Sequence, residues 1–208
     1  ENDRIISLGD IVDRGPNSPG VVDFFMKTPN AFCIFGNHER KHLWVYDGLM
    51  SPSNFSRNQE KTMWQFRESS TDGSLDKYLA ALRYFKTLPW FIDLPEAILV
   101  HAGLTYGVPL EEQREKILTG VGFTKKSGTT ASGLPTWSYF YPQDAKPVIF
   151  GHMGIGKAPW LLPQRNNLWP IDTGCWAGGF LTAVTLPDFH VHQIKSLQPS
   201  RKRPKFRT

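Results

Sequence analysis

Four short apolar segments of the chain each lead into a residue that can bind a metal ion, with a glycine beside it or close by. The segments are residues 4–8, 31–35, 97–100 and 147–150, and the residues that follow them are Asp10, Asn37, His101 and His152. Apolar runs of this length, bounded by turn residues, predict buried strands. In open α/β sheets, ligands bind at the carboxyl ends of the strands. Four such positions in succession are hard to obtain by chance, so we expect them to form one site.

The remaining segments predict further helices and strands around these four. A Ser-Pro pair at residues 18–19 is an N-cap and first-turn signal for a helix that ends near Lys27. Residues 40–88 have helical character, with an apolar stripe at a 3.6-residue spacing within residues 75–85. Three later strands are expected at residues 169–172, 181–186 and 189–194. This order predicts an α/β fold.

The charge of the chain is concentrated at its C-terminal end. Six of the 24 Lys and Arg residues lie in residues 195–208, which contain no acidic residue, so the rest holds 18 basic against 19 acidic residues. We therefore expect a nearly neutral core over residues 1–194, followed by a basic, disordered tail. The tail is either a solvated terminus or an arm that makes weak contact with RNA or another polyanion.

The composition excludes several classes of protein. The chain has 208 residues, enough for one domain with a sizeable core. No apolar run approaches the ~18 residues of a membrane-spanning helix, so we expect no membrane partner. Two cysteines, Cys33 and Cys175, cannot form a disulfide framework, which indicates a reducing, cytoplasmic setting.

Four motifs occur in order along the chain and resemble those of one enzyme family. The motifs are Gly9-Asp10-Ile11-Val12-Asp13-Arg14-Gly15, Gly36-Asn37-His38-Glu39, His101-Ala102-Gly103 and Gly151-His152. Together they resemble the calcineurin-like metallophosphoesterases. The likeness is strongest to the branch of bacterial Ser/Thr protein phosphatases and symmetrical diadenosine-tetraphosphate hydrolases, and it spans about residues 4–186. The resemblance implies a β-sandwich flanked by helices, with a two-metal site at the strand ends.

The metal ligands follow from this resemblance. It implies that Asp10 bridges two divalent ions and that Asn37, His101 and His152 hold the second ion. The residue types agree with this chemistry, because a carboxylate offers two oxygens and mixed nitrogen and oxygen ligands suit Mn, Fe, Zn or Ni. Two such ions clamp an in-line displacement at phosphorus and generate hydroxide near neutral pH.

The resemblance also implies roles for three residues beside the metal ligands. His38 would protonate the leaving oxygen, Asp13 would orient His38, and Arg14 would grip the phosphate. An imidazole next to a carboxylate suits proton donation near pH 7, and the guanidinium fork matches phosphate oxygens. The predicted reaction is phosphoester hydrolysis by direct attack of a metal-bound hydroxide.

One family motif has no match in the chain. The Asp-x-His that would supply the other ligands of the first metal should precede Gly9 by about one βα unit, but only eight residues stand there, beginning at Glu1. We interpret this as a missing N-terminal part, including the first βα unit, which would leave the first metal site incomplete. True loss of the motif would instead indicate a catalytically deficient binding module.

The substrate class stays open between a phosphorylated protein and a nucleotide. The predicted function is that of a Ser/Thr protein phosphatase, which the motifs resemble most, and the alternative is that of a dinucleoside polyphosphate hydrolase. His38 to His42 also fit the zinc-protease pattern HExxH, but charged residues inside the motif and a strand directly before it argue against a zinc-binding helix. We expect His42 to be a surface or capping residue, Trp44 to be a candidate for stacking on a base, and Asp172 to orient a ligand or form a turn.

Overall fold

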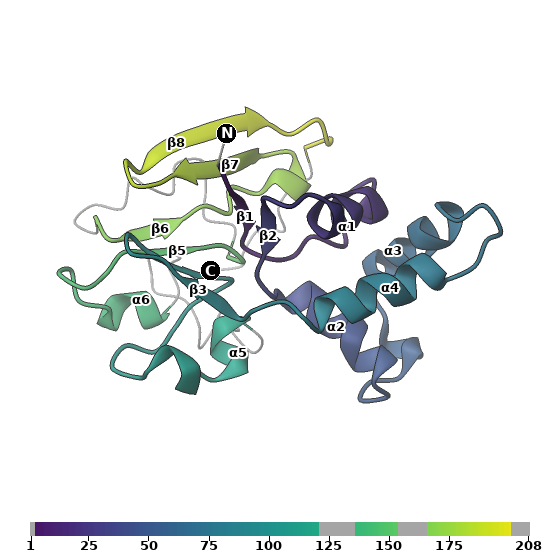
Figure 1. The fold of residues 1–208 in the computed structure, drawn as a ribbon, viewed down its shortest axis with the longest axis horizontal. Helices are drawn as coiled ribbons and strands as arrows, with labels where there is room; N and C mark the ends of the chain where they lie inside the picture. Colours follow the sequence, from purple (N-terminus) through teal and green to yellow (C-terminus); the bar gives the residue numbers. More distant parts are fainter. Residues whose placement is uncertain (1–2, 121–135, 154–165, 201–208) are drawn as a thin grey trace. The chain divides into compact units, whose positions relative to one another are not determined.

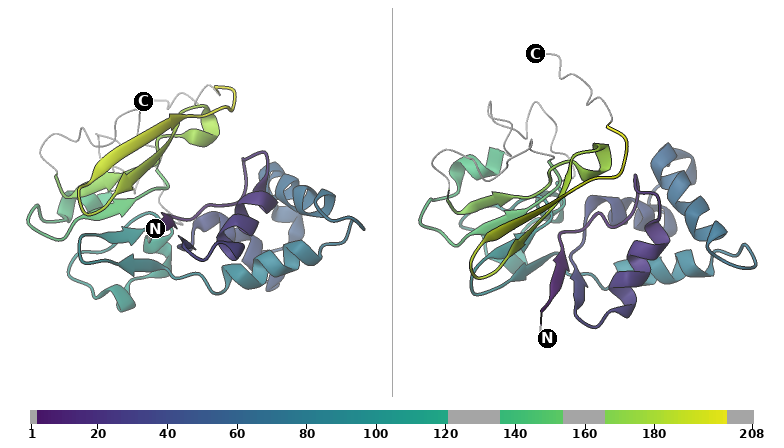
Figure 2. Two further views of the ribbon diagram at one scale, coloured as in Figure 1. Left: turned by 45° about the horizontal axis from the view of Figure 1, so that its top comes forward. Right: turned by 90° about the horizontal axis from the view of Figure 1, so that it is seen from above.

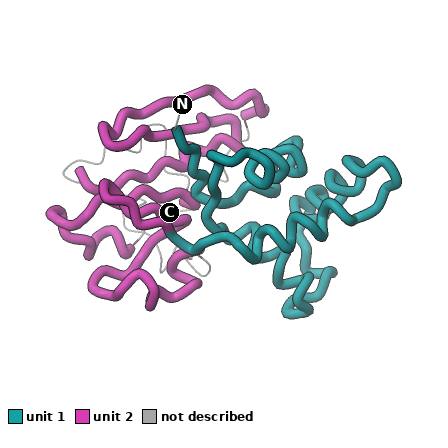
Figure 3. The backbone as a smooth tube through the Cα atoms, in the orientation of Figure 1, with its two compact units in different colours: residues 1–91 teal, residues 92–208 magenta. Residues whose placement is uncertain are grey.

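The computed structural model describes residues 3–120, 136–153 and 166–200. The chain divides into two compact units, residues 1–91 and residues 92–208 (Figure 3). The division falls inside the predicted core of residues 1–194. Each unit is described by itself below.

Unit 1, residues 1–91, combines two parallel strands with four helices (Figure 1). Its elements in order are β1 (Ile5–Ser7), α1 (Ser18–Lys27), β2 (Ala31–Cys33), α2 (Asn37–Tyr46), the 3-10 turn η1 (Pro52–Asn54), α3 (Arg57–Glu68) and α4 (Asp76–Phe85). Ile5 pairs with Ala31 and Ser7 with Cys33, so both strands deliver their following loops to the same edge. The predicted helix after Ser18 is confirmed, but its N-cap is Asn17, whose side chain accepts the Gly20 N–H at 3.0 Å.

The core of unit 1 lies between its helices. The apolar stripe predicted within residues 75–85 places Tyr78, Leu82 and Phe85 of α4 in the interior. Helix α4 packs against α1, α2 and α3. Full burial of a side chain such as Leu82 stabilises the fold by about 1.5–3 kcal/mol, which holds the helices against one another.

Unit 2, residues 92–208, is built on a four-stranded sheet in the order β3-β4-β5-β6. Its elements are β3 (Phe91–Asp93), which begins at the division, β4 (Ile98–Val100), η2 (Leu110–Glu112), α5 (Glu115–Leu118), α6 (Thr136–Phe140), β5 (Val148–Phe150), β6 (Leu168–Pro170), η3 (Cys175–Ala177), β7 (Phe180–Thr185) and β8 (His190–Lys195). Strands β4, β5 and β6 run parallel, and β7 and β8 form an antiparallel hairpin, visible as a long ribbon in Figure 2. The mixed α/β class expected from the sequence is confirmed.

Most strand boundaries differ from the sequence expectation by one or two residues, and two of the differences bear on the argument. The second strand ends at Cys33 rather than Phe35, because the Phe35 N–H donates to the Pro89 carbonyl instead of the partner strand. Strand β8 ends at Lys195, the first residue of the predicted tail, and the Ser196 N–H still bonds to the Gly179 carbonyl. Residues 201–208, which carry five of the six Lys and Arg residues of the predicted tail, lie outside the described residues. None of the helices in the described ranges is long and apolar enough to cross a membrane.

Candidate active site

The loop after β1 has a strained backbone. Asp10, Asp13 and Arg14 have φ values of 55°, 68° and 60°, in the left-handed region that side chains other than glycine rarely adopt. Each such residue costs about 1–3 kcal/mol and persists only where its surroundings hold it in place. Three in one loop mark this segment as a functional site.

The N-terminal end of α2 is hydrogen-bonded to this loop at Asp10. The Asp10 Oδ1 accepts the His38 N–H at 3.0 Å, and the Asp10 N–H donates to Glu39 Oε2 at 2.9 Å. The same Glu39 oxygen accepts the Gly36 N–H at 2.9 Å. A Cβ at Gly36 would lie 2.5 Å from both the nitrogen and Oδ1 of Asp10. The glycine is therefore needed for close approach, and Asn37 is held between two residues that touch Asp10.

Glu39 is a candidate site residue, through its hydrogen bond to Asp10, that sequence reasoning did not single out. Its side chain is fully buried, and burial together with the neighbouring charge of Asp10 raises its pKa to about 7. The signal that could have found it is its place at the third position of a helix, where a Glu side chain reaches back to the N-cap N–H.

The predicted pair of Asp13 and His38 is formed within unit 1. Their Oδ2 and Nδ1 atoms are 2.5 Å apart, and the Asp13 side chain is fully buried. Burial opposes ionisation of Asp13, but hydrogen bonds with His38 and His42 hold its pKa well below the usual range. The pKa of His38 is raised overall. Burial and the charge of Arg14 lower it, but the charge of Asp10 and the hydrogen bond to Asp13 raise it by more. The His38 Nε2 atom lies 3.7 Å from Asp10 Oδ2.

The expectation for His42 was wrong, because its side chain is fully buried. Its Nε2 lies 3.0 Å from Asp13 Oδ1, and its Nδ1 lies 2.8 Å from the Tyr78 hydroxyl. The sequence signal was the spacing of four residues from His38, which places both imidazoles on one face of α2. Since both His42 nitrogens have these partners, the HExxH pattern does not form a zinc-protease helix.

In unit 2, the sheet brings His101 and His152 together. Strands β4 and β5 pair in parallel with Val100 opposite Phe150, and the Gly151 N–H bonds to the His101 carbonyl at 2.9 Å. The His101 Nε2 and His152 Nδ1 atoms are 3.2 Å apart. His152 itself has a positive φ of 68°. Two imidazole nitrogens that face each other at the ends of adjacent strands suit a shared cation.

Backbone and packing contacts support the two histidines. A Cβ at Gly120, whose φ is +69°, would lie 2.6 Å from the His152 ring. The indole N–H of Trp137 donates to the Ala102 carbonyl at 3.1 Å, next to His101. Nothing in the sequence alone linked Gly120 to His152, because the two positions lie 32 residues apart along the chain.

The donor set fits divalent metal ions. The four predicted ligands lie two in each unit: Asp10 and Asn37 in unit 1, and His101 and His152 in unit 2. Carboxylate, amide and imidazole donors together suit Mn, Fe, Zn or Ni. The structure brings each pair together, and the meeting of the two pairs around a common ion stays a prediction.

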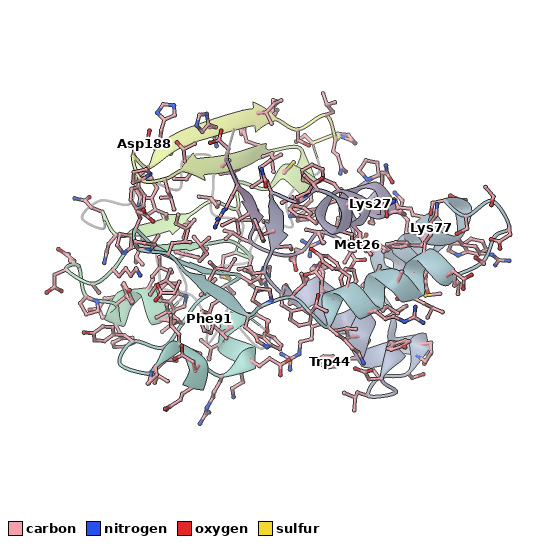
Figure 4. All side chains as sticks on the ribbon, in the orientation of Figure 1. Met26, Lys27, Trp44, Lys77, Phe91 and Asp188 are labelled. Atoms are coloured by element: carbon pink, nitrogen blue, oxygen red, sulfur yellow. The ribbon has the colours of Figure 1, made fainter. Side chains whose placement is uncertain are left out.

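Three other residues have clear surroundings. Trp44 is labelled in Figure 4. The guanidinium carbon of Arg40 lies 4.4 Å from the centroid of its ring, and the stacking of a base on Trp44 stays a prediction. The Asp172 Oδ1 accepts the Gly174 N–H at 3.0 Å, which supports its role in a turn. The Cys33 thiol is buried in the core, and burial raises its pKa, so a nucleophilic thiolate is not expected there.

The fold and the site define a class of enzyme, and residues 1–155 match the family described as calcineurin-like phosphoesterases. The chain belongs to this family and is a metallophosphoesterase, a hydrolase class that works with a dinuclear divalent metal centre. The family predicted from the four motifs is therefore confirmed.

The names of curated relatives bear on the choice between the two predicted substrate classes. Proteins named "Bis(5'-nucleosyl)-tetraphosphatase PrpE [asymmetrical]" are 26% identical in Anoxybacillus flavithermus and 28% identical in Oceanobacillus iheyensis. These matches cover 94% and 95% of this chain and 80% of each relative. A crystal structure of a protein provisionally described as a diadenosine tetraphosphatase has a TM-score of 0.65 at 22% identity, covering 93% of this chain and 81% of that one. That structure supports the fold, while the names of the relatives favour the alternative over the Ser/Thr phosphatase.

Proposed function

We propose that this protein is a metal-dependent hydrolase of dinucleoside tetraphosphates that cleaves them asymmetrically. The support for the substrate is the naming of relatives that match more than nine-tenths of the chain. The support for the chemistry is the family and the arrangement around Asp13 and His38. A phosphoprotein substrate has no comparable support among the relatives.

The observation that carries the proposal is the hydrogen bond between the buried Asp13 carboxylate and His38 Nδ1. Because the carboxylate accepts a hydrogen bond from Nδ1, the other ring nitrogen, Nε2, is available to donate a proton to the leaving oxygen. The raised pKa of His38 keeps this imidazole protonated closer to neutral pH. Arg14, in the same strained loop, would bind the phosphate through its guanidinium fork.

The proposed metal ligands are Asp10, Asn37, His101 and His152. Metal ions held there would polarise the phosphoryl oxygens and stabilise the charge that develops in the transition state. The identity of the metals is part of the proposal, with Mn, Fe, Zn and Ni all compatible with the donors. The chain's own contribution is to hold the ligands, the phosphate and the proton donor in a fixed arrangement.

The substrate is tested by a side-by-side assay. The protein is supplied with Mn²⁺ and given either diadenosine tetraphosphate or a phosphoserine peptide, and the products are separated by chromatography. Asymmetrical cleavage yields AMP and ATP, whereas symmetrical cleavage yields only ADP. Release of phosphate from the peptide at a higher kcat/KM than cleavage of the nucleotide would overturn the proposal in favour of a protein phosphatase.

The site assignment is tested by Asp10→Asn. The amide keeps an oxygen that accepts the His38 N–H, so the melting temperature should stay close to that of the wild type. Loss of a metal-binding carboxylate should lower kcat by about 10³-fold, because the metal supplies several kcal/mol of transition-state stabilisation. Unchanged turnover with this variant would remove Asp10 from the site.

A further inference from the structure

The buried carboxylate of Asp13 receives hydrogen bonds from more than its partner His38. Besides His42 at 3.0 Å, the Thr62 hydroxyl donates to Asp13 Oδ1 at 2.7 Å. Tyr78 extends the set through its bond to His42 Nδ1 at 2.8 Å. These three side chains come from α2, α3 and α4, and each is at most 7% exposed.

The direction of each hydrogen bond follows from the charge of Asp13. An ionised carboxylate only accepts, so His42 donates to it from Nε2, and in the neutral tautomer with that proton Nδ1 is an acceptor. The Tyr78 hydroxyl donates to Nδ1 in this tautomer. Burial raises the pKa of the Tyr78 hydroxyl, which keeps it protonated as a donor. The order of donation is thus Tyr78 to His42 to Asp13, and His38 donates to the opposite oxygen of the same carboxylate.

We propose that His42, Thr62 and Tyr78 are positioning residues that align the proton donor His38 through Asp13. This inference rests on the proposed function and deepens it. Two donors on Oδ1 restrict rotation of the carboxylate, so Oδ2 has one favoured direction in which to meet His38. None of the three touches a reacting atom. Their effect is to restrict the orientation of the imidazole, and misplacement by ~1 Å can cost about 10²-fold in rate.

A purely structural network is the competing explanation, since buried polar groups are usually hydrogen-bonded whatever their function. The two explanations differ in how strongly a variant's loss of rate depends on the leaving group of the substrate. Misaligned proton donation slows an ester whose leaving oxygen needs a proton, whereas a general loss of structure slows all substrates alike. The test is therefore a comparison of phenyl phosphate, a poor leaving group, with p-nitrophenyl phosphate, a good one.

The experiment uses the full chain with Mn²⁺ and two variants, Tyr78→Phe and Thr62→Val, which each delete one hydroxyl and keep the shape of the side chain. Since general acid catalysis supplies roughly 10²–10⁴-fold, partial misalignment should lower kcat on phenyl phosphate by about tenfold and on p-nitrophenyl phosphate by less than about threefold. Thr62→Ser, which retains the hydroxyl, should keep the ratio of kcat on phenyl phosphate to kcat on p-nitrophenyl phosphate at its wild-type value. Tyr84→Phe removes a hydroxyl from the same helix, α4, outside this network, and should leave the ratio unchanged.

A second measurement follows the aligned proton directly. The short bond between His38 and Asp13 should give a downfield imidazole N–H resonance in proton NMR, and Tyr78→Phe should shift or broaden it while the protein stays folded. An equal fall on both esters with an unmoved resonance would overturn this inference alone. The rates of the wild-type chain on the two esters are the reference for every variant, while the nucleotide assay judges the proposed function separately.

Discussion

Unit 1 and unit 2 each carry two of the proposed metal ligands, but they support them in different ways. In unit 1, side chains support the site: Glu39 bonds the loop of Asp10, and three helices contribute hydrogen bonds around Asp13. In unit 2, the two histidines follow adjacent parallel strands, and the Gly151 N–H bonds to the His101 carbonyl. The comparison suggests that unit 1 would combine two metal ligands with the proton donor, whereas the two histidines of unit 2 would serve metal binding alone.

This difference has a physical reason. A proton donor must be held in one tautomer and one direction, which requires fixed hydrogen-bond partners on the far side of the ring. An imidazole that binds a metal needs its ring nitrogen within reach of the ion, and adjacent parallel strands together with packing contacts bring the two rings of unit 2 close. Substitutions at these two histidines should therefore respond to added metal, and substitutions that disturb only the Asp13–His38 pair of unit 1 should not.

The largest expected effect tests the metal-binding half. His152→Ala removes an imidazole donor and should weaken Mn²⁺ binding by more than about 100-fold, since even indirect support of a ligand is worth 10–100-fold. Turnover should recover in part at high Mn²⁺ concentration. Metal titration by calorimetry and assays over a range of Mn²⁺ concentrations measure both. Unchanged affinity would break the assignment of unit 2 to metal binding.

A matched pair of glycines sharpens this prediction. Gly120→Ala pushes a methyl group against the His152 ring and should weaken metal binding by about tenfold. Gly107 has a similar positive φ of +79° but has open space around it, so Gly107→Ala carries the backbone strain without the clash. Equal losses in both variants would mean that strain, and not the position of His152, sets the affinity.

An intermediate effect is expected at the close approach in unit 1. Gly36→Ala places a Cβ 2.5 Å from Asp10 and should destabilise the protein by about 1–3 kcal/mol, a fall in melting temperature of roughly 2–4 °C per kcal/mol. Gly15→Ala is the control, because its nearest non-neighbouring atom lies at 3.8 Å. A melting temperature of Gly36→Ala equal to that of Gly15→Ala would contradict the need for close approach at Gly36.

The smallest effect concerns the pH dependence of stability in the metal-free protein. The lowered pKa of Asp13 contributes stability that is present above its unfolded pKa, near 3.9, and is lost as the pH falls further. The raised pKa of His38 contributes stability that is present below its unfolded pKa, near 6.5, and is lost as the pH rises through the folded value. Each slope is limited to about 1.4 kcal/mol per pH unit for one proton.

Urea unfolding in the presence of a chelator measures this profile. The wild type should be most stable at about pH 4, because the raised pKa of Glu39 makes stability fall as the pH rises from its unfolded value, about 4.3, toward about 7. Asp13→Asn should flatten the acid side, and it should change the slope above about pH 6.5 because it removes a charge on which His38 depends. His38→Gln should change the slope above about pH 6.5 only. A wild-type profile identical to that of Asp13→Asn would mean that this pair contributes no pH-dependent stability.

Much of the fold and of the site could be predicted from the chain. The strands before Asp10, His101 and His152 are short apolar runs that end in glycine or polar residues, and within each unit the pairing of parallel strands brings the strand ends to one edge of that unit's sheet. The Asp13–His38 pair was also predicted, from its motifs. These successes depend on local patterns, since periodicity and motif spacing are carried by neighbouring residues.

Local pattern determined much of the order of strands and helices, the family, and the residue types that are proposed to meet substrate and metal. Only the tertiary structure placed Thr62 and Tyr78 with the His42–Asp13 pair, and Gly120 beneath His152. Thr62 lies 49 residues from Asp13 along the chain, and a hydrogen bond acts over about 3 Å. Contacts of that range leave no periodic trace in the sequence, so they exist only once helices have packed and the carboxylate has been buried between them.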